Sequence, residues 1–381
     1  MKTERPIVSQ LQKHPSIWHR IVSVVLAFAN IIAAIGLTIS AYSGSINPIV
    51  HPTAPAIAMT FPIWLIGAII LLIISLFIRI RLAAIIGLGI IASLPTTLNF
   101  SPLHLPKHAS DNGFTFTVMS YNVLGLEDQN KQYFGDINPT LSYILNQDPD
   151  IVCLQEMPPL HTSSRLHITA AQIDSIHCQY PYVLIASKSQ AIFSKFPVEP
   201  IQMGFKYSGE SGSADMACFR AEIKGQKVTI FNVHLQSFSL VDEDKEMFKK
   251  LTRLKGSETE IAQMRSHLVN KIREAAPQRV LDTEELIKYI RKFGGPNVIV
   301  CGDFNDVPGS YPLRMLADEH LKEVYPEVGF GPMITYNANR FYFRIDHILY
   351  RGDLTPLSMK RGAVKSSDHY PVIATFEIPD N

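Results

Sequence analysis

The hydrophobic positions of this chain are concentrated in three long apolar runs within the first hundred residues. The runs cover residues 21–42, 57–78 and 82–98, and Pro95 interrupts the last of them. A helix of about 20 apolar residues crosses the hydrocarbon core of a bilayer, so each run is a predicted membrane-spanning helix. None of the runs contains an ionisable residue, which predicts an anchor rather than a transporting bundle.

The basic residues around these runs predict how the anchor is oriented. Four of them precede the first run: Lys2, Arg5, Lys13 and Arg20. Residues 43–56 contain no Lys or Arg, whereas Arg79 and Arg81 separate the second run from the third. The positive-inside rule therefore predicts a cytoplasmic N-terminus and, after three crossings, a domain outside the cytoplasm. A signal peptide cleaved near Ser40 is the alternative, which the length of the first run and the presence of further runs disfavour.

After the anchor of residues 1–100, the pattern changes to short apolar segments typical of strands. Residues 101–113 contain Pro, Ser and Gly and are a predicted linker to a soluble domain at 114–381. The predicted strands lie at 114–121, 151–154, 182–186, 191–193, 216–223, 227–233, 298–301, 341–350 and 372–378. Strands and helical patterns mix without strict alternation. This favours an α/β fold in which two packed β-sheets have helices outside, in one domain.

One segment, residues 242–292, has Leu, Ile and Met at helical spacing among charges of both signs. Mixed charge runs usually face water, so we interpret it as a largely solvated helical insertion. Contact with an anionic substrate or lipid surface is the alternative for four of its basic residues: Lys249, Lys250, Arg253 and Lys255.

Composition excludes few function classes. The net charge is +1, which lacks the strong basic field of many nucleic-acid binders, although a few local groups and a metal are enough to hold a phosphodiester. The four cysteines show no C-x-x-C spacing and predict neither a zinc site nor a disulfide framework. Cys153 and Cys301 lie in apolar segments and are predicted to be buried; pairing of Cys178 with Cys218 stays open.

Polar residues of catalytic type stand where several apolar strands end. They are Asn122, Glu156, His234, Asp303 with Asn305, and Asp368 with His369, whereas Asp346 is placed within a predicted strand. Taken alone, the stretch at Asp303 is equally well explained as a solvated turn. Because ligands bind beyond the carboxyl ends of strands in layered α/β folds, we expect these residues to share one edge. Their carboxylates, amides and histidines suit a hard metal ion and phosphoryl transfer.

Six short motifs carry a resemblance to a known superfamily. In chain order they are Ser120-Tyr121-Asn122-Val123, Leu154-Gln155-Glu156, Asn232-Val233-His234-Leu235, Gly302-Asp303-Phe304-Asn305-Asp306, Arg344-Ile345-Asp346-His347 and Ser367-Asp368-His369-Tyr370-Pro371. The sequence from about residue 114 to 378 resembles the endonuclease/exonuclease/phosphatase superfamily, which includes deoxyribonucleases, sphingomyelinases and inositol polyphosphate phosphatases. The resemblance implies a four-layer α/β sandwich of two mixed sheets flanked by helices.

The resemblance and the chemistry of the side chains together predict the roles. Glu156 is the expected Mg²⁺ ligand, with Mn²⁺ as an alternative ion, and Asn122 and Asp368 complete or support that site. Asp303 orients or deprotonates the attacking water, and Asn305 positions the water or holds a phosphate oxygen.

The histidines are predicted to act on the phosphate. His369 donates to the phosphoryl oxygens while Asp346 holds its ring in the productive tautomer. His234 matches the additional histidine of the deoxyribonuclease and sphingomyelinase branches, and is a predicted phosphate ligand or general acid.

These features predict a membrane-tethered, Mg²⁺-dependent hydrolase of phosphodiester bonds. Its substrate is a phosphate ester, either nucleic acid or a phospholipid head group, and no obligate protein partner is evident. Tethering mildly favours a lipid or envelope substrate. The alternatives are a lipid or sugar phosphate phosphatase and a non-catalytic binding module on the same fold.

Overall fold

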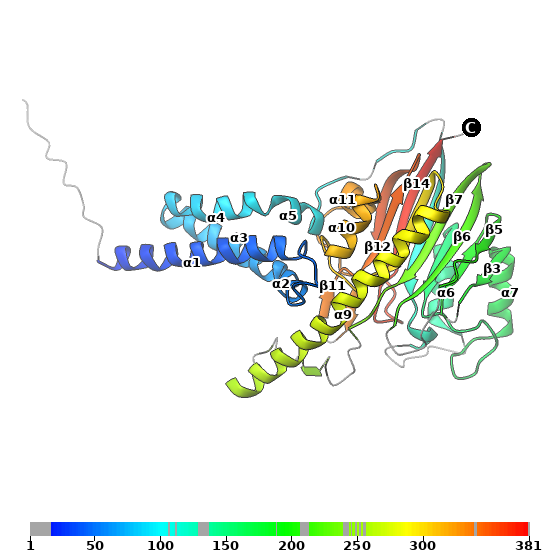
Figure 1. Ribbon diagram of the computed structural model, residues 1–381, viewed down its shortest axis with the longest axis horizontal. Coiled ribbons are helices and arrows are strands. Elements are labelled where there is room, and N and C mark those ends of the chain that lie inside the picture. The colour runs from blue at the N-terminus through cyan, green and yellow to red at the C-terminus, as the bar shows by residue number, and fades with distance from the viewer. Residues whose placement is uncertain are drawn as a thin grey trace, which may run out of the picture. The chain divides into compact units, whose positions relative to one another are not determined.

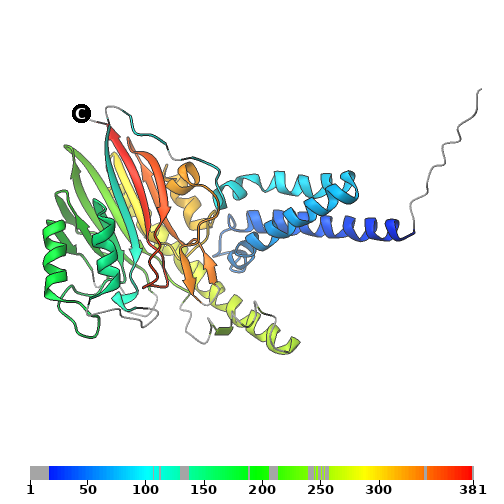
Figure 2. The same cartoon turned by 180° about the vertical axis from the view of Figure 1, so that it is seen from behind.

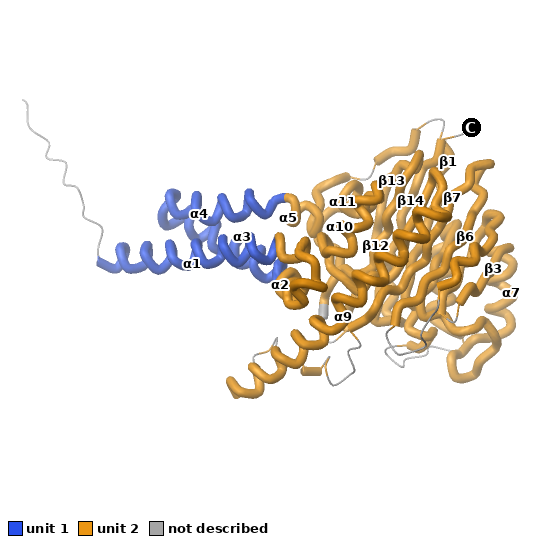
Figure 3. The backbone as a smooth tube through the Cα atoms, in the orientation of Figure 1, with its two compact units in different colours: residues 1–41, 60–94 blue, residues 42–59, 95–381 orange. Residues whose placement is uncertain are grey.

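The computed structural model describes residues 17–379 except 106, 111–112, 129–136, 188, 206–212, 239–243, 245, 248–249, 251–252, 254–256 and 339–340. Lys249 and Lys255, two of the basic residues considered for anionic contacts, lie outside the described residues. The chain forms two compact units (Figure 3). The first consists of Met1–Ala41 and Thr60–Leu94, and the second of Tyr42–Met59 and Pro95–Asn381.

The first unit is built from apolar helices. They are α1 (Ile17–Ser43), α3 (Phe61–Ile78) and α4 (Ile80–Ala92). Asn30 joins all three, because its Nδ2 donates to Ser75 Oγ at 2.8 Å and to the Leu82 carbonyl at 2.9 Å. Gly36 lets α1 approach α3 closely: a Cβ there would lie 2.6 Å from the Trp64 ring.

Two helical segments, Ile17–Ser43 and Ala54–Ile78, are long and apolar enough to cross a membrane. Of the three predicted spans, the first two are found as single helices, and the third is not a single helix of sufficient length. There the chain forms α4 and α5 (Leu94–Phe100), which are bent by 64° at the break between them. Pro95 lies in the first turn of α5, where a backbone N–H is not needed for a helical hydrogen bond. Because it lacks that N–H, it cannot continue the backbone hydrogen bonds of α4.

The second unit contains two six-stranded mixed sheets (Figure 1). Sheet one has the order β13-β14-β1-β2-β4-β3, with β1 (Gly113–Asn122), β2 (Ile151–Gln155), β3 (Tyr182–Ile185), β4 (Ala191–Ser194), β13 (Thr355–Arg361) and β14 (Val372–Pro379). Sheet two has the order β5-β6-β7-β8-β12-β9, with β5 (Val198–Ile201), β6 (Asp215–Ile223), β7 (Gln226–His234), β8 (Asn297–Asp303), β9 (Lys322–Glu323) and β12 (Asp346–Arg351). A hairpin of β10 (Tyr336–Ala338) and β11 (Phe341–Phe343) stands apart from both sheets.

The two sheets face each other, and helices cover their outer faces (Figure 2). Apolar side chains such as Val118, Ile230 and Ile299 fill the space between the sheets. Sheet one is covered by α6 (Pro139–Gln147) and α7 (Ala170–Gln179), and sheet two by α9 (Glu258–Phe293) and α10 (Tyr311–Asp318). The short helices α2 (Ala54–Ala58) and α11 (Val324–Val328) and the turn η1 (Leu124–Leu126) complete the described elements. The predicted pair of packed sheets with helices outside is confirmed.

Two predicted segments differ from the structure. The charged segment 242–292 is solvated only in part. Residues 258–267 of α9 have no buried side chain, whereas the later turns of the helix are buried against sheet two through residues such as Leu286 and Ile290. The predicted strand 341–350 is two strands, β11 and β12, since Arg344 and Ile345 between them belong to neither. This break between the strands places Asp346 at the start of β12 rather than in the middle of a strand.

The described cysteines are all free thiols. Cys153 and Cys301 are fully buried between the sheets, as predicted. Cys178 is exposed on α7, and Cys218 is buried in β6.

Candidate active site

The predicted catalytic residues meet at one edge of the two sheets. Strands β1 and β2 are parallel, as are β7 and β8, so the carboxyl ends within each pair point the same way. Strand β12 is antiparallel to β8, and Asp346 at its start lies opposite Asp303 at the end of β8. Gly302 permits the close approach of β8 to β7, because a Cβ at its φ of 150° would clash with the Val233 carbonyl. The edge therefore gathers side chains from both sheets.

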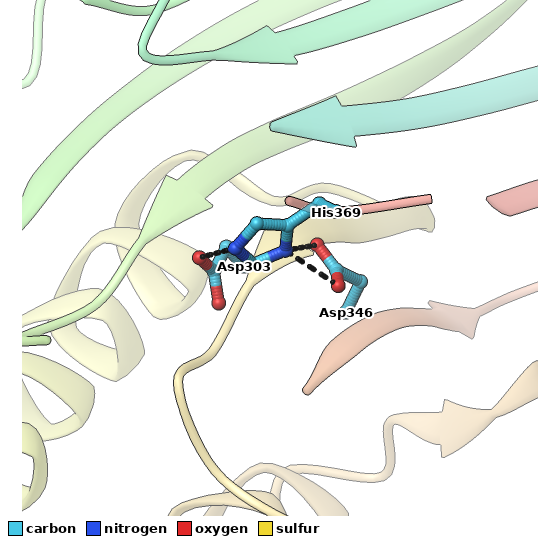
Figure 4. Close-up of side chains that lie close together, drawn as sticks. All are labelled: Asp303, Asp346 and His369. Carbon is cyan, nitrogen blue, oxygen red and sulfur yellow. Dashed lines mark hydrogen bonds and ion pairs between the residues drawn. The ribbon is translucent and has the colours of Figure 1, made fainter. Parts of the chain in front are cut away.

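At the centre of this edge, the imidazole of His369 lies between two aspartates (Figure 4). Its Nδ1 is 2.9 Å from Asp346 Oδ2, and its Nε2 is 3.4 Å from Asp303 Oδ2. The side chains of both aspartates are only 1% exposed. The ring is thus held by a carboxylate on each side in a site nearly closed to water.

Burial and charge shift the pKa values of this group in defined directions. Burial alone would lower the pKa of His369, but the charges of Asp346 and then Asp303 outweigh it and hold the pKa well above the usual range. Burial raises the pKa of Asp303; His369 opposes this increase, and Asp346 adds to it. Because each carboxylate stabilises the imidazolium between them, the group favours a proton on His369.

Further contacts fix His369 and Asp346 in position. The ring of Tyr336 packs edge-on against His369, with 4.9 Å between ring centroids. The backbone N–H of His369 donates to Ser367 Oγ at 3.1 Å, and that hydroxyl donates to the Asn122 carbonyl at 2.8 Å. Thr335 Oγ1 accepts the backbone N–H of Asp346 at 3.1 Å.

The turn after β8 positions Asp303 and Asn305. The N–H of Asn305 donates to Asp303 Oδ1 at 2.8 Å, and Asn305 Nδ2 donates to the Leu235 carbonyl at 3.0 Å. Asn305 has a φ of 51°, in the left-handed region that few residues other than glycine adopt. Asn305 thus lies beside Asp303, as expected, and its side-chain amide is hydrogen-bonded to the segment that follows β7.

Asn122 and Glu156 come from sheet one. Asn122 Nδ2 donates to Glu156 Oε1 at 2.9 Å and to Asp303 Oδ2 at 3.1 Å, while its Oδ1 accepts from the N–H of Leu124. Asn122 therefore connects the two carboxylates as a donor. The side chain of Glu156 is 38% exposed, and its backbone has a φ of 53°. A glutamate in this costly conformation, facing solvent beside buried carboxylates, is a candidate ligand.

His234 and Asp368 lie on the margins of the group. His234 Nε2 is 3.6 Å from Asp303 Oδ2 and 3.9 Å from Glu156 Oε1, so it stands between the two carboxylates. Asp368 is buried next to His369 and is hydrogen-bonded to Tyr336. All eight predicted residues thus lie at or beside this edge, and their roles remain predictions.

The sequence did not point to Arg279, which supports the turn from behind. This arginine of α9 is fully buried; it donates to the Asn305 carbonyl, lies 3.2 Å from Asp306 Oδ2, and its guanidinium is 4.2 Å from the ring centroid of Phe238. One signal in the sequence could have shown that Arg279 is buried. It is a charged residue on the apolar face of α9, one turn after Ala275 and Ala276.

The donor set fits a divalent metal ion. The ligand atoms of Asp303, Asp346 and His369 lie within 4.8 Å of one another, close enough to hold an ion together. Both ring nitrogens of His369 already face carboxylates, however, whereas Glu156 offers a partly exposed carboxylate next to Asp303. A hard cation prefers oxygen ligands and keeps several waters, so the side of the site near Glu156 fits it better.

Comparison with known proteins identifies the family of this chain. The model of the endonuclease/exonuclease/phosphatase family matches residues 119–369, and that of a domain of unknown function matches residues 23–100. A similar curated protein is carbon catabolite repressor protein 4 homolog 2 of Arabidopsis thaliana, 25% identical over 272 residues, or 65% of this chain. This chain spans 44% of that relative's length.

Three solved structures are similar at low identity. A humanized D. rerio TDP2 is 18% identical with a TM-score of 0.45, covering 69% of this chain and 98% of its own. ANGEL2, a 2′,3′-cyclic phosphatase solved with adenosine-2′,3′-vanadate, is 19% identical with a TM-score of 0.43, covering 71% and 97%. A family protein from Bacteroides thetaiotaomicron is 14% identical with a TM-score of 0.45, covering 70% and 98%. On the strength of the family model, this chain belongs to the endonuclease/exonuclease/phosphatase family.

Proposed function

We propose that this chain is a membrane-tethered, Mg²⁺-dependent phosphodiesterase in which an activated water attacks the phosphorus atom. The observation that carries the proposal is the buried His369 held between Asp346 and Asp303, with the partly exposed Glu156 linked to Asp303 through Asn122. A proton donor and a proton acceptor side by side, next to an open carboxylate, suit hydrolysis of a phosphate ester.

In this proposal the buried aspartates and histidines move and hold protons. Asp303 accepts the proton of the attacking water, and Asn305 keeps the turn that aims this carboxylate. His369 donates to a phosphoryl oxygen, while Asp346 keeps its Nδ1 protonated and the ring oriented. His234, which lies between Asp303 and Glu156, contacts the phosphate or protonates the leaving oxygen.

Glu156 would hold the metal ion, with Asn122 and Asp368 completing or supporting the site. When bound, Mg²⁺ would neutralise phosphate charge and stabilise the leaving oxygen. Mn²⁺ has the same preference for carboxylate and water ligands and is the alternative ion.

The contacts of residues 42–59 support a third crossing of the membrane. These residues follow the first candidate span, yet they pack in the same compact unit as residues 95–381. If α1 crosses the bilayer, residues 42–59 lie on the far side of the membrane. For residues 95–381 to lie on that same side, the chain between residues 60 and 94 must cross the membrane twice. The bent pair of α4 and α5 is then the return segment. With the positive-inside rule, the catalytic domain lies outside the cytoplasm.

The test is an assay of the full-length protein in detergent or nanodiscs with Mg²⁺. The substrate panel contains plasmid DNA, RNA, sphingomyelin, glycerophosphodiesters, phosphoinositides and a phosphate monoester. We expect hydrolysis of a diester that Asp303→Asn and His369→Ala each abolish, whereas Asp174→Asn and His177→Ala on the exposed side of α7 leave it intact. Turnover that survives both site substitutions contradicts the mechanism.

Other outcomes of the same panel separate the alternatives. Preference for the monoester identifies a phosphatase, and substrate binding without turnover identifies a binding module. The orientation is tested with a C-terminal alkaline phosphatase fusion, which is expected to be active, because this reporter works only outside the cytoplasm.

A further inference from the structure

The segment between the first two candidate spans, residues 42–59, is packed into the catalytic unit. Three residues of its short helix α2 are buried, namely Ala54, Pro55 and Ala58. Ala56 and Met59 pack against Phe238, Ile272 and Ala275, which places this segment along the middle of α9. The segment is therefore part of the domain that carries the candidate site.

Met59 also packs against a second apolar cluster, next to the β10–β11 hairpin. There it packs against the buried cluster formed by Tyr336, Ala338 and Ile345, as does Phe343 of the hairpin. Methionine is unbranched and fills irregular gaps, which suits a side chain that joins α9 to the β10–β11 hairpin. Met59 thus lies between the long helix and the chain that leads to Asp346.

The residues that Met59 supports are direct neighbours of the His369 group. Tyr336 presents its ring to His369 at 4.9 Å between centroids. Ile345 precedes Asp346 in the chain, and its carbonyl accepts the N–H of Phe304, next to Asp303, at 2.9 Å. A shift of this cluster would displace the imidazole and both carboxylates together.

We propose that Met59 is a positioning residue that holds Tyr336 and Ile345 against the catalytic group, so that residues 42–59 are required for turnover. The inference rests on the proposed phosphodiesterase activity. Met59 lies two residues before the start of α3, so the geometry of the site depends on a segment covalently joined to the anchor. A domain cut after the anchor, beginning near residue 107, would lack this support.

The test compares variants of the full-length protein on the substrate identified above. Met59→Ala removes the bridging side chain and is expected to lower kcat by about tenfold with KM within about twofold, since small misplacements of catalytic groups reduce the rate. Met59→Leu fills most of the same space and should restore kcat. Ile57→Ala, two residues earlier in the same segment, is the matched control, because that side chain is 41% exposed, and it should leave kcat unchanged.

Hydrogen exchange measured on the same variants gives a readout that is independent of activity. Met59→Ala should speed exchange in residues 335–338 and 345–346, with the core of sheet two unchanged, and Met59→Leu should not. An active wild type whose kcat and exchange are unaltered by Met59→Ala overturns the inference, as does a rise in KM alone. A wild type inactive on every substrate contradicts the proposed function instead, and the exchange data then still decide whether Met59 supports the cluster.

Discussion

Two parts of the candidate site carry the same kind of group in opposite surroundings. On the open side, the carboxylate of Glu156 is 38% exposed, whereas on the sealed side Asp303 and Asp346 are 1% exposed. A metal ion that arrives with its waters needs a carboxylate that solvent can reach. Proton transfer benefits from groups shielded from water, where charges interact more strongly. The difference in burial thus favours metal binding on the open side and proton transfer on the sealed side.

On the sealed side, the charge of the histidine balances the charges of the two carboxylates. Two buried carboxylates facing each other would be costly, since burial of an unpaired charge is strongly unfavourable. His369 compensates because each of its nitrogens faces one aspartate. Asn122 then couples the two sides by donating to Glu156 and Asp303.

The largest effect is expected from Asp303→Asn on the sealed side. This change keeps the shape of the side chain but removes the proton acceptor, and general-base catalysis typically contributes 10²–10⁴-fold, so kcat should fall by about 10³-fold. Steady-state kinetics with saturating metal measure it, and the thermal unfolding midpoint of the variant should stay near that of the wild type. A loss smaller than tenfold would mean that Asp303 is not the base.

The next largest effect is a loss of stability, expected from Arg279→Ala behind the sealed side. The change leaves Asp306 buried without its partner, and breaking a buried ion pair in this way costs about 3–5 kcal/mol of unfolding free energy. Denaturant unfolding followed by circular dichroism measures it. Arg273→Ala, on the exposed face of the same helix, is the control and should change the unfolding free energy by less than about 0.5 kcal/mol.

The sequence predicted the layers and the site edge because both depend on local pattern. Apolar strands such as residues 298–301 that end at polar residues mark the carboxyl ends of strands, and parallel strands bring these ends together. Asp346 was predicted in the middle of one strand because residues 341–350 are apolar or aromatic on both sides of the central Arg344-Ile345-Asp346-His347. The break at Arg344 and Ile345, after which Asp346 starts β12, has no Gly or Pro to mark it.

What the sequence could not predict depends on contacts between distant segments. Arg279 was interpreted as one of many charges in a solvated helix, because nothing local shows that its partners are Asn305 and Asp306. Met59 was part of a predicted span, and its packing between α9 and β10 joins segments more than 200 residues apart, as the residue numbers show. Long-range packing of this kind leaves no periodic signal.

A smaller loss, about 10²-fold in kcat, is expected from Asp346→Asn, which leaves the base in place but weakens control of His369. Asp346 contributes to the raised pKa of His369, so without its charge that pKa falls. If protonated His369 is the donor, wild-type activity persists until the pH rises through the raised pKa, and the alkaline limb of the variant moves to lower pH. A pH–rate profile measures this shift. An unchanged alkaline limb would show that His369 is not the titrating donor.

On the open side, Glu156→Gln should have the smallest effect on kcat at saturating metal, because other oxygen ligands and water can still surround the ion. The neutral amide is a poorer ligand, so the Mg²⁺ concentration for half-maximal activity should rise by about 100-fold, the upper end of the range for loss of a group that only supports a metal ligand. Mg²⁺ titration after chelator treatment measures it, with the exposed Glu199→Gln on β5 as control. If Asp303→Asn weakened metal binding more than Glu156→Gln did, the ion would belong to the sealed side, and the division between the two sides would be wrong.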